Sequence, residues 1–258
     1  MKRFRLTIEY DGRPYVGWQR QDNGLGVQEV IEDAVKAFSG EDVRVFCAGR
    51  TDAGVHAKAQ VAHFELDRDD LSANTVQNAI NFHTKPHPIS ILDAVEVDED
   101  FHARFSATER EYLYVILNRR ARAALEIGFV WWVPTPLDAD AMHEAAQILV
   151  GKHDFSTFRA SFCQADSPVK TLDEISVTRE GEHIYIKVRA RSFLHHQVRN
   201  IVGSLSWVGG TKWKKPDLQR AFDAKDRNAG GPKAPSDGLY MVRVGYEARE
   251  DSSHASGQ

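Results

Sequence analysis

Apolar and polar residues alternate along several short stretches of this chain, with the period of two that half-buried β-strands show. Between these stretches, apolar residues recur every three or four positions, as they do on one face of an amphipathic helix. Over the first hundred residues the two patterns predict strand 4–10, helix 27–38, strands 43–48 and 60–66, helix 71–82 and strand 89–97. This β-α-β-β-α-β order is typical of ferredoxin-like and RRM-like folds.

The second half of the chain predicts the same order less regularly. Its elements are expected as strand 108–117, helix 138–150, hairpin 174–178 with 183–191, buried helix 194–208, an extra helix near 217–224 and strand 239–246. We therefore predict an α/β (α+β) protein with two RRM-like lobes, 1–105 and 106–247, whose mixed, mainly antiparallel sheets meet at a central cleft. Ser72 or a neighbouring Asp should cap the second helix, and Asp138 the third. Residues 228–237 are expected to form a mobile loop and 248–258 a disordered tail.

Composition favours a globular protein, since 42% of the 258 residues are hydrophobic and 27% are charged. The first residues contain no long apolar segment and no run of 18 apolar residues occurs, so we expect no secretion or membrane insertion and a cytoplasmic protein. Cys47 and Cys163 are the only cysteines and lie far apart, which fits reduced thiols and gives no zinc-binding spacing.

The formal net charge of −4 disfavours a nucleic-acid partner when taken alone. Acidic residues gather at 67–70, 93–100 and 247–251, however, while many Lys and Arg residues lie near glycine-rich or aromatic segments. A basic cleft on an acidic body is therefore compatible with the sequence, although composition alone does not establish it.

Asp52 is the strongest candidate for a reactive group. It lies two residues after Arg50 in a turn bracketed by Gly49 and Gly54, at the end of a predicted strand. A nearby guanidinium would keep this carboxylate ionised. The same spacing also fits a structural ion pair that braces the turn, and local chemistry alone favours that simpler interpretation.

Six blocks in fixed order extend the picture well beyond this turn. They are 9–12 with 17–21, 49–57 with 60–64, 100–107, 110–114, 193–203 and 238–240. Together they resemble the motifs of the TruA family of tRNA pseudouridine synthases, over the chain from about residue 3 to 244.

The resemblance implies roles for four further positions. Asp52 would be the essential group, either attacking the base or ribose or abstracting the C2′ proton, and the sequence leaves these routes open. Arg199 lies on an otherwise apolar helix and needs a partner, for which the resemblance implies Asp52. Tyr112 would stack on the target uracil and Leu239 would cover its other side, while Arg50 belongs to the same catalytic motif.

Five other side chains are candidates for holding RNA phosphates: Arg20, Lys58, His102, Arg104 and Arg110. Each of them taken singly could be an ordinary surface residue. The resemblance further implies tRNA as partner, uridines 38, 39 and 40 as targets, a homodimer, and no cofactor or metal.

Two other functions stay open at the level of sequence. One is a non-catalytic RRM-like RNA-binding protein, although glycine-aromatic strings typical of that class are absent. The other is a metal-dependent hydrolase that uses Asp52 with His56 and His63. His195 and His196 are adjacent and lack a usual ligand spacing, so we predict no metal site.

Overall fold

A computed structural model describes residues 1–247, so the predicted tail at 248–258 lies outside the described residues. The strands are β1 (Lys2–Tyr10), β2 (Phe46–Cys47), β3 (His56–Leu66), β4 (Ile89–Val97), β5 (Ala107–Asn118), β6 (Trp131–Val133), β7 (Gly151–Asp154), β8 (Val169–Glu180), β9 (His183–Ala190) and β10 (Leu239–Tyr246). The α-helices are α1 (Val27–Ser39), α2 (Ala73–His83), α3 (Ala139–Ala146), α4 (Gln197–Gly209) and α5 (Lys215–Asp223). No helix within residues 1–247 is both long and apolar enough to cross a bilayer.

All the strands belong to one sheet, in the order β4-β1-β3-β10-β5-β9-β8-β7, with β2 beside β3 and β6 beside β5. Each half repeats the same spatial order of its own strands: fourth, first, third, second. In the first half this is β4-β1-β3-β2, and in the second half β10-β5-β9-β8. The predicted α/β class with two β-α-β-β-α-β units is therefore confirmed, whereas β6 and β7 were not anticipated.

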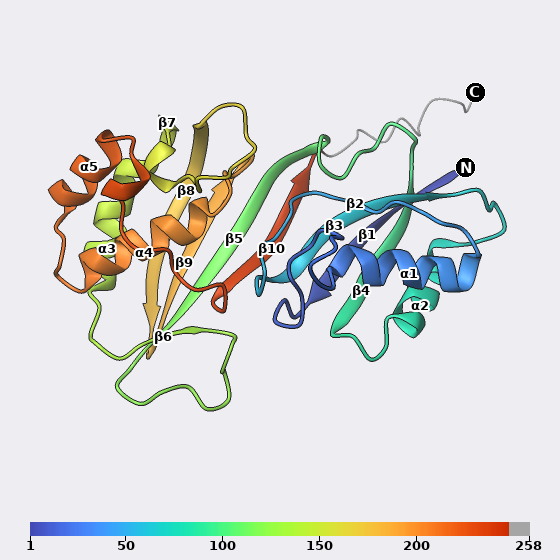
Figure 1. Ribbon diagram of the computed structural model, residues 1–258, viewed down its shortest axis with the longest axis horizontal. Helices are drawn as coiled ribbons and strands as arrows, with labels where there is room; N and C mark the ends of the chain where they lie inside the picture. The colour runs from blue at the N-terminus through green and yellow to red at the C-terminus, as the bar shows by residue number, and fades with distance from the viewer. Residues whose placement is uncertain (248–258) are drawn as a thin grey trace, which may run out of the picture.

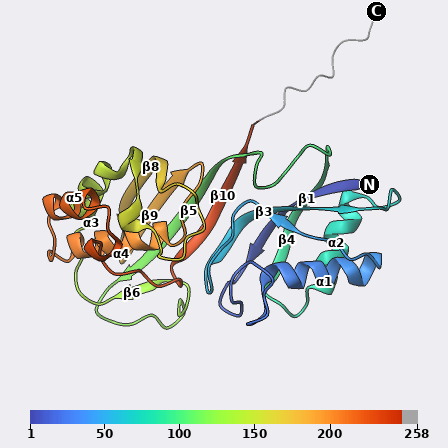
Figure 2. The same ribbon diagram turned by 45° about the horizontal axis from the view of Figure 1, so that its top comes forward.

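The two halves are joined edge to edge where β3 and β10 run parallel. The register pairs Tyr240 with His56 and Met241 with Ala57. Helices α1 and α2 lie at one end of the long sheet and α3, α4 and α5 at the other (Figures 1 and 2). A single apolar cluster extends through both halves, from Ile31 and Phe64 to Met142 and Ile186. The division at residue 105 stays a prediction.

The helix boundaries follow their caps. Ser72 accepts a hydrogen bond from the Thr75 amide, and Asp138 accepts one from the Ala141 amide, as predicted. Helix α4 begins three residues later than expected, at Gln197, because His196 has a left-handed backbone with φ of 64°. This kink at the start of α4 matters for the site described below.

Two segments differ from their predicted state. The strand expected at 43–48 shrinks to β2, because the Val45 amide donates to Glu32 Oε1 on α1 instead of joining the sheet. Residues 228–237 were expected to form a mobile loop, but this segment packs closely on α4. A Cβ on Gly203 of α4 would lie 1.7 Å from the Pro232 carbonyl oxygen. Ala234 in the same segment is buried and donates its amide to the Arg199 carbonyl.

Candidate active site

The loop that carries Asp52 connects β2 to β3 and is fixed through its backbone. The Trp18 amide donates to the Thr51 carbonyl at 3.0 Å, and the Thr51 hydroxyl lies 2.7 Å from the Tyr10 hydroxyl. Gly17, with φ of 122°, forms a bridge with Asp52, and a Cβ there would approach the Thr51 carbonyl oxygen to 2.7 Å. Only glycine fits so close to this loop. The carboxylate of Asp52 is thus presented from a rigid turn.

Within residues 1–247 the carboxylate of Asp52 has three polar partners, and all of them come from the start of α4. Its Oδ2 lies 3.1 Å from Arg199 Nη1 and 3.3 Å from His196 Nε2, while its Oδ1 lies 3.2 Å from His195 Nε2. The ion pair of Asp52 with Arg199 is the one that the resemblance implied. The side chains are 21% and 10% exposed, so this contact is shielded from water.

Arg199 is held on its other side by the segment that covers α4. Its Nε donates to the Ala234 carbonyl at 2.8 Å, while its Nη1 donates to Asp52. A buried guanidinium needs such partners, since an unpaired charge at this depth is destabilising by several kcal/mol. The geometry aims the charge of Arg199 at Asp52 and leaves little freedom for the carboxylate to turn.

The two histidines were missed as site residues. The left-handed backbone at His196 turns both rings toward Asp52, and their centroids lie 3.9 Å apart. Burial lowers the pKa of His196 to about 4, although Asp52 acts in the opposite direction. His196 is therefore neutral near pH 7. Adjacent histidines were set aside for lacking a ligand spacing, and nothing in the sequence signals the backbone kink that brings them here.

Asp52, His195 and His196 are also the group that could hold a metal ion. One ligand atom from each lies within 4.8 Å of the others. Imidazole nitrogens with one carboxylate oxygen suit zinc-like ions. The guanidinium of Arg199 occupies Oδ2 of the same carboxylate, however, and would compete with a cation there. The expected absence of a metal stays a prediction.

Arg50 does not have the contact expected of it. Its side chain is exposed, and the ion-pair partner of Asp52 within residues 1–247 is Arg199, with the two histidines beside it. No ion pair within 4.0 Å joins Arg50 to Asp52 among residues 1–247, and the catalytic role expected of Arg50 stays a prediction. Two residues of a tight turn need not point the same way, and here the aspartate faces α4 while the arginine faces solvent.

Tyr112 and Leu239 lie on adjacent strands below the loop. Tyr112 on β5 is buried, and its ring packs edge-to-face on Phe193 with centroids 5.2 Å apart. Its hydroxyl would lie 3.7 Å from a Cβ on Gly49, which places it against the start of the Asp52 loop. Burial raises the pKa of Tyr112, and the charges of Tyr10 and Asp52 add to this effect. Leu239 is buried at the first position of β10.

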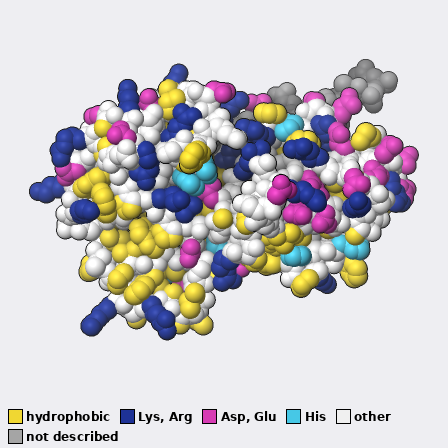
Figure 3. Space-filling view, in the orientation of Figure 1, with side chains coloured by type: hydrophobic (Ala, Val, Ile, Leu, Met, Phe, Trp, Pro, Cys, Tyr) yellow, Lys and Arg dark blue, Asp and Glu magenta, His cyan; other side chains and the backbone are white. Residues whose placement is uncertain are grey.

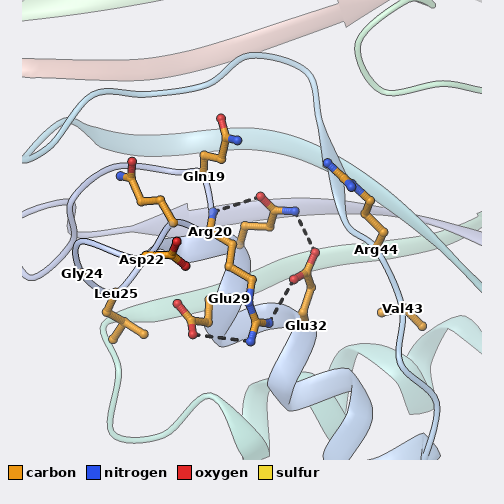
Figure 4. Close-up of a pocket in the computed structure, with 11 residues that line it drawn as sticks. Gln19, Arg20, Asp22, Gly24, Leu25, Glu29, Glu32, Val43 and Arg44 are labelled. Atoms are coloured by element: carbon orange, nitrogen blue, oxygen red, sulfur yellow. Dashed lines mark hydrogen bonds and ion pairs between the residues drawn. The ribbon is translucent and has the colours of Figure 1, made fainter.

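Arg20 is neutralised by carboxylates. Its guanidinium lies 3.5 Å from Glu29, 3.3 Å from Glu32 and 3.4 Å from Asp33, and Figure 4 shows it between the first two. This cluster lines a surface pocket of about 770 Å³ near the start of α1. None of the groups around Asp52 lines this pocket. Arg20 is thus poorly placed to attract a phosphate.

Arg110 is the one predicted phosphate ligand that the structure turns inward. It is buried and donates to the backbone carbonyls of Ala48, Arg104, Ala107 and Arg191. Its donors are used in clamping the root of the Asp52 loop to the turn at 104. We therefore correct its role from phosphate contact to structural clamp.

His102 is also engaged by the backbone. Its Nδ1 accepts from the Arg104 amide at 3.1 Å, and burial lowers the pKa of His102. A neutral imidazole that caps a turn gives no charge to a phosphate. A proton would have to bind at Nδ1, but the lone pair of Nδ1 already accepts the hydrogen bond from the Arg104 amide.

Lys58 and Arg104 remain as exposed cations, and Arg44 and Arg50 join them. None of the four has a carboxylate within ion-pair distance among residues 1–247. Lys58 lies over the Tyr240 ring at 5.4 Å, and Arg104 over the Phe105 ring at 5.5 Å. Figure 3 shows basic side chains gathered at the upper middle of one face, beside the hollow between the two halves.

His56 and His63 lie in the sheet and have structural partners. His56 is buried, with Nδ1 accepting from the Gly12 amide and Nε2 donating to the Gly128 carbonyl at 2.9 Å. His63 Nδ1 accepts from the Ala103 amide at 3.1 Å. The hydrolase hypothesis, which grouped these histidines with Asp52, is therefore wrong in its choice of ligands.

A family model described as tRNA pseudouridine synthase matches residues 6–106 and 145–247. The chain belongs to the tRNA pseudouridine synthase family. Curated relatives carry the name tRNA pseudouridine synthase A. The chain is 61% identical to the one from Rhodospirillum centenum, over 95% of this chain and 100% of that protein, and 56% identical to the one from Paramagnetospirillum magneticum, over 100% of both. The one from Maricaulis maris is 57% identical over 95% of this chain and 98% of that protein.

The family assignment inferred from the six motif blocks is thus confirmed, and with it the enzyme class, an isomerase. Among solved structures, the crystal structure of a Cbf5-Nop10-Gar1 complex aligns with 93% of this chain and 49% of that chain. Its TM-score is 0.41 at 11% sequence identity, a likeness too weak to add to the assignment.

Proposed function

We propose that this protein isomerises uridine to pseudouridine at positions 38, 39 and 40 of the tRNA anticodon arm, with Asp52 as the catalytic group. The observation that carries the proposal is the carboxylate of Asp52, which is held by Arg199, His195 and His196 at 3.1 to 3.3 Å. Family membership and the names of the relatives support the substrate. A purely RNA-binding protein would gain nothing from this arrangement.

The reaction makes definite demands on the site. The bond from C1′ to N1 breaks, the base turns, and a bond from C1′ to C5 forms, so N1 gains a proton and C5 loses one. No electrons are gained or lost overall. An ionised, oriented carboxylate can begin this sequence either as a nucleophile or as the base that takes the C2′ proton. Arg199 orients the carboxylate of Asp52 in either route.

The uracil must leave its stacked position in the RNA to reach Asp52, at a cost of a few kcal/mol. Tyr112 and Leu239 lie on neighbouring strands next to the loop and are proposed to enclose the extruded base from two sides. The pKa of Tyr112 is raised, so its hydroxyl stays protonated and the ring acts as a neutral surface.

Binding of the RNA backbone is assigned to Lys58 and Arg104, with Arg44 and Arg50 in addition. Exposed cations without carboxylate partners are the ones free to exchange their counterions for phosphates. A cytoplasmic homodimer completes the proposal, because a second copy would extend the basic surface along a rigid L-shaped substrate.

The direct test is to incubate the protein with unmodified tRNA transcripts and to map pseudouridine by chemical derivatisation and primer extension. Stops at positions 38 to 40 with the parent protein, and none with Asp52→Asn, are expected. Absence of pseudouridine from transcripts with uridine at these positions, at stoichiometric protein, would refute the proposal.

A further inference from the structure

A line of aromatic rings lies on the surface beside the Asp52 loop. Phe46 stacks on His63 with centroids 5.2 Å apart and tilts against His102 at 5.6 Å. His102 in turn contacts Phe105 at 4.4 Å. We call these four rings, with Arg44 and Arg104 at the two ends, the aromatic shelf.

The outer rings of the shelf are open to solvent. Phe105 is 71% exposed and Phe46 is 40% exposed, although both are fully apolar. Exposing apolar rings brings the fold no stability, so an exposed pair next to an active site indicates a contact made with something else. The two histidines beneath them are uncharged, since burial lowers the pKa of His63 to about 4 and also lowers the pKa of His102.

The charges around the shelf select the kind of partner. The guanidinium of Arg44 lies 5.7 Å from the Phe46 ring centre, and that of Arg104 lies 5.5 Å from the Phe105 ring centre. The ion pairs found among residues 1–247 include neither of these arginines. Rings interleaved with free guanidinium groups match a nucleobase with its phosphate: the base stacks and the arginine pairs with the backbone. Another protein surface would more often bring carboxylates to both ends.

The shelf is coupled rigidly to the catalytic loop. Phe46 precedes the loop by two residues, and Arg110 Nη2 donates to the carbonyls of both Ala48 and Arg104. This single guanidinium ties the root of the loop to the turn that carries Phe105. A base seated on the shelf is therefore held at a fixed place relative to Asp52.

We propose that the aromatic shelf binds an unpaired nucleobase of the RNA substrate outside the active site. The inference rests on the proposed function for the identity of the RNA. The role of the aromatic shelf is to hold the RNA in place while the target uridine is extruded toward Asp52. Figure 3 shows histidine, hydrophobic and basic side chains together at the top of this face, where β2 and the β4–β5 connection run in Figure 1.

The test is equilibrium binding of an anticodon stem-loop RNA to variants with the full chain. Phe105→Ala should weaken binding by about 5- to 150-fold, which is the effect of one stacked base, while Phe105→Tyr should stay within about twofold of the parent. Phe82→Ala is the matched control, because Phe82 is 67% exposed on α2 at the outer end of the first half. It should leave affinity unchanged. Thermal melting checks that each variant is folded.

RNAs with one abasic nucleotide at each unpaired position in turn locate the partner of the shelf. At one position the loss caused by Phe105→Ala should disappear, since the base that it contacts is already absent. Equal affinities of Phe105→Ala and Phe82→Ala, or a loss that no abasic position removes, would overturn the proposal. A change of oligomeric state in Phe105→Ala without a change in RNA affinity would also overturn it, in favour of a protein contact.

Pseudouridine mapping with the parent protein keeps the two proposals apart. If the parent isomerises tRNA but Phe105→Ala binds as the parent does, the shelf fails alone. If the shelf binds an unpaired base but no pseudouridine forms, the proposed function fails and the shelf stands.

Discussion

Removing the guanidinium of Arg199 should lower the free energy of unfolding far more than removing an ion pair of the same length at the surface. The Asp52–Arg199 contact and the Lys215–Glu144 contact both measure 3.1 Å. Their surroundings differ: the first pair is 21% and 10% exposed, whereas Lys215 and Glu144 are 46% and 74% exposed. Hydrogen bonds to shielded charged groups contribute about 1.5–3 kcal/mol, and exposed pairs about 0.2–1 kcal/mol.

Two double-mutant cycles measure this difference directly. The first combines Asp52→Asn with Arg199→Met, and the second combines Glu144→Gln with Lys215→Met. Urea unfolding of each variant should give a coupling free energy of about 2 kcal/mol for the first cycle and under about 1 kcal/mol for the second. The apolar Met keeps much of the length of Arg199 on an apolar helix, so the variant retains packing.

The same coupling should appear in catalysis, because the interaction orients the reactive carboxylate. A loss of about 2 kcal/mol corresponds to a fall in kcat of about 30-fold for Arg199→Met, with RNA affinity little changed. Equal coupling energies in the two cycles would refute the reasoning. They would mean that Arg199 neighbours Asp52 without holding it.

Four further outcomes follow from the site and its surroundings. Asp52→Asn should abolish isomerisation and keep tRNA affinity within a few-fold, and residual turnover within tenfold of the parent, measured on the same preparation, would exclude Asp52 as the catalytic group. Tyr112→Ala should slow single-turnover isomerisation by an amount equal to about 1–3 kcal/mol of lost stacking, whereas Tyr112→Phe should keep most of the rate unless the hydroxyl itself takes part. Isomerisation should persist in excess EDTA, and a loss that zinc restores, with the tRNA fold verified, would contradict a metal-free reaction. Because burial lowers the pKa of His63 to about 4, the unfolded chain binds a proton at this side chain that the folded chain does not between about pH 6.5 and 4. His63 should therefore contribute about 3 kcal/mol to the fall in stability on acidification through this window, in addition to the contribution of His196, whose pKa is lowered in the same direction. The fall should be smaller in His63→Gln, as urea unfolding at several pH values can show.

Periodicity predicted the sheet elements because most strands of this protein bury one face. Strand β4 and strand β10 begin and end where alternation places them, and the caps at Ser72 and Asp138 followed from side-chain chemistry. Strands β6 and β7 were not predicted, because three or four residues are too few to show a period. The joining of two sheets into one depends on two residue pairs between β3 and β10, which no local pattern reveals.

The site was predictable only where chemistry and motif agreed. Asp52 and Arg199 were paired through the family resemblance, because local chemistry alone favoured a structural ion pair for Asp52 and required only some partner for Arg199. Arg50 was expected to point toward Asp52 but is exposed, since spacing in a turn does not fix the direction of a side chain. The placement of His195 and His196 beside Asp52 depends on the left-handed backbone of one residue, His196. The inward orientation of Arg110 depends on the positions of four carbonyl groups. Neither feature could be predicted from the sequence.

The site exists only because the two halves of the sheet are registered against each other. Asp52 comes from the first half, while the partners of its carboxylate among the described residues lie 143 to 147 positions further along the chain, at the start of α4. Near the site the two halves are joined by the short β3–β10 pairing and by Arg110 of β5, which donates to the Ala48 carbonyl at the root of the Asp52 loop. Small movements between the halves would lengthen the contact of Asp52 with Arg199 before they disrupted the apolar cluster that extends through both halves. Changes at the junction should therefore reduce catalysis well before they reduce stability.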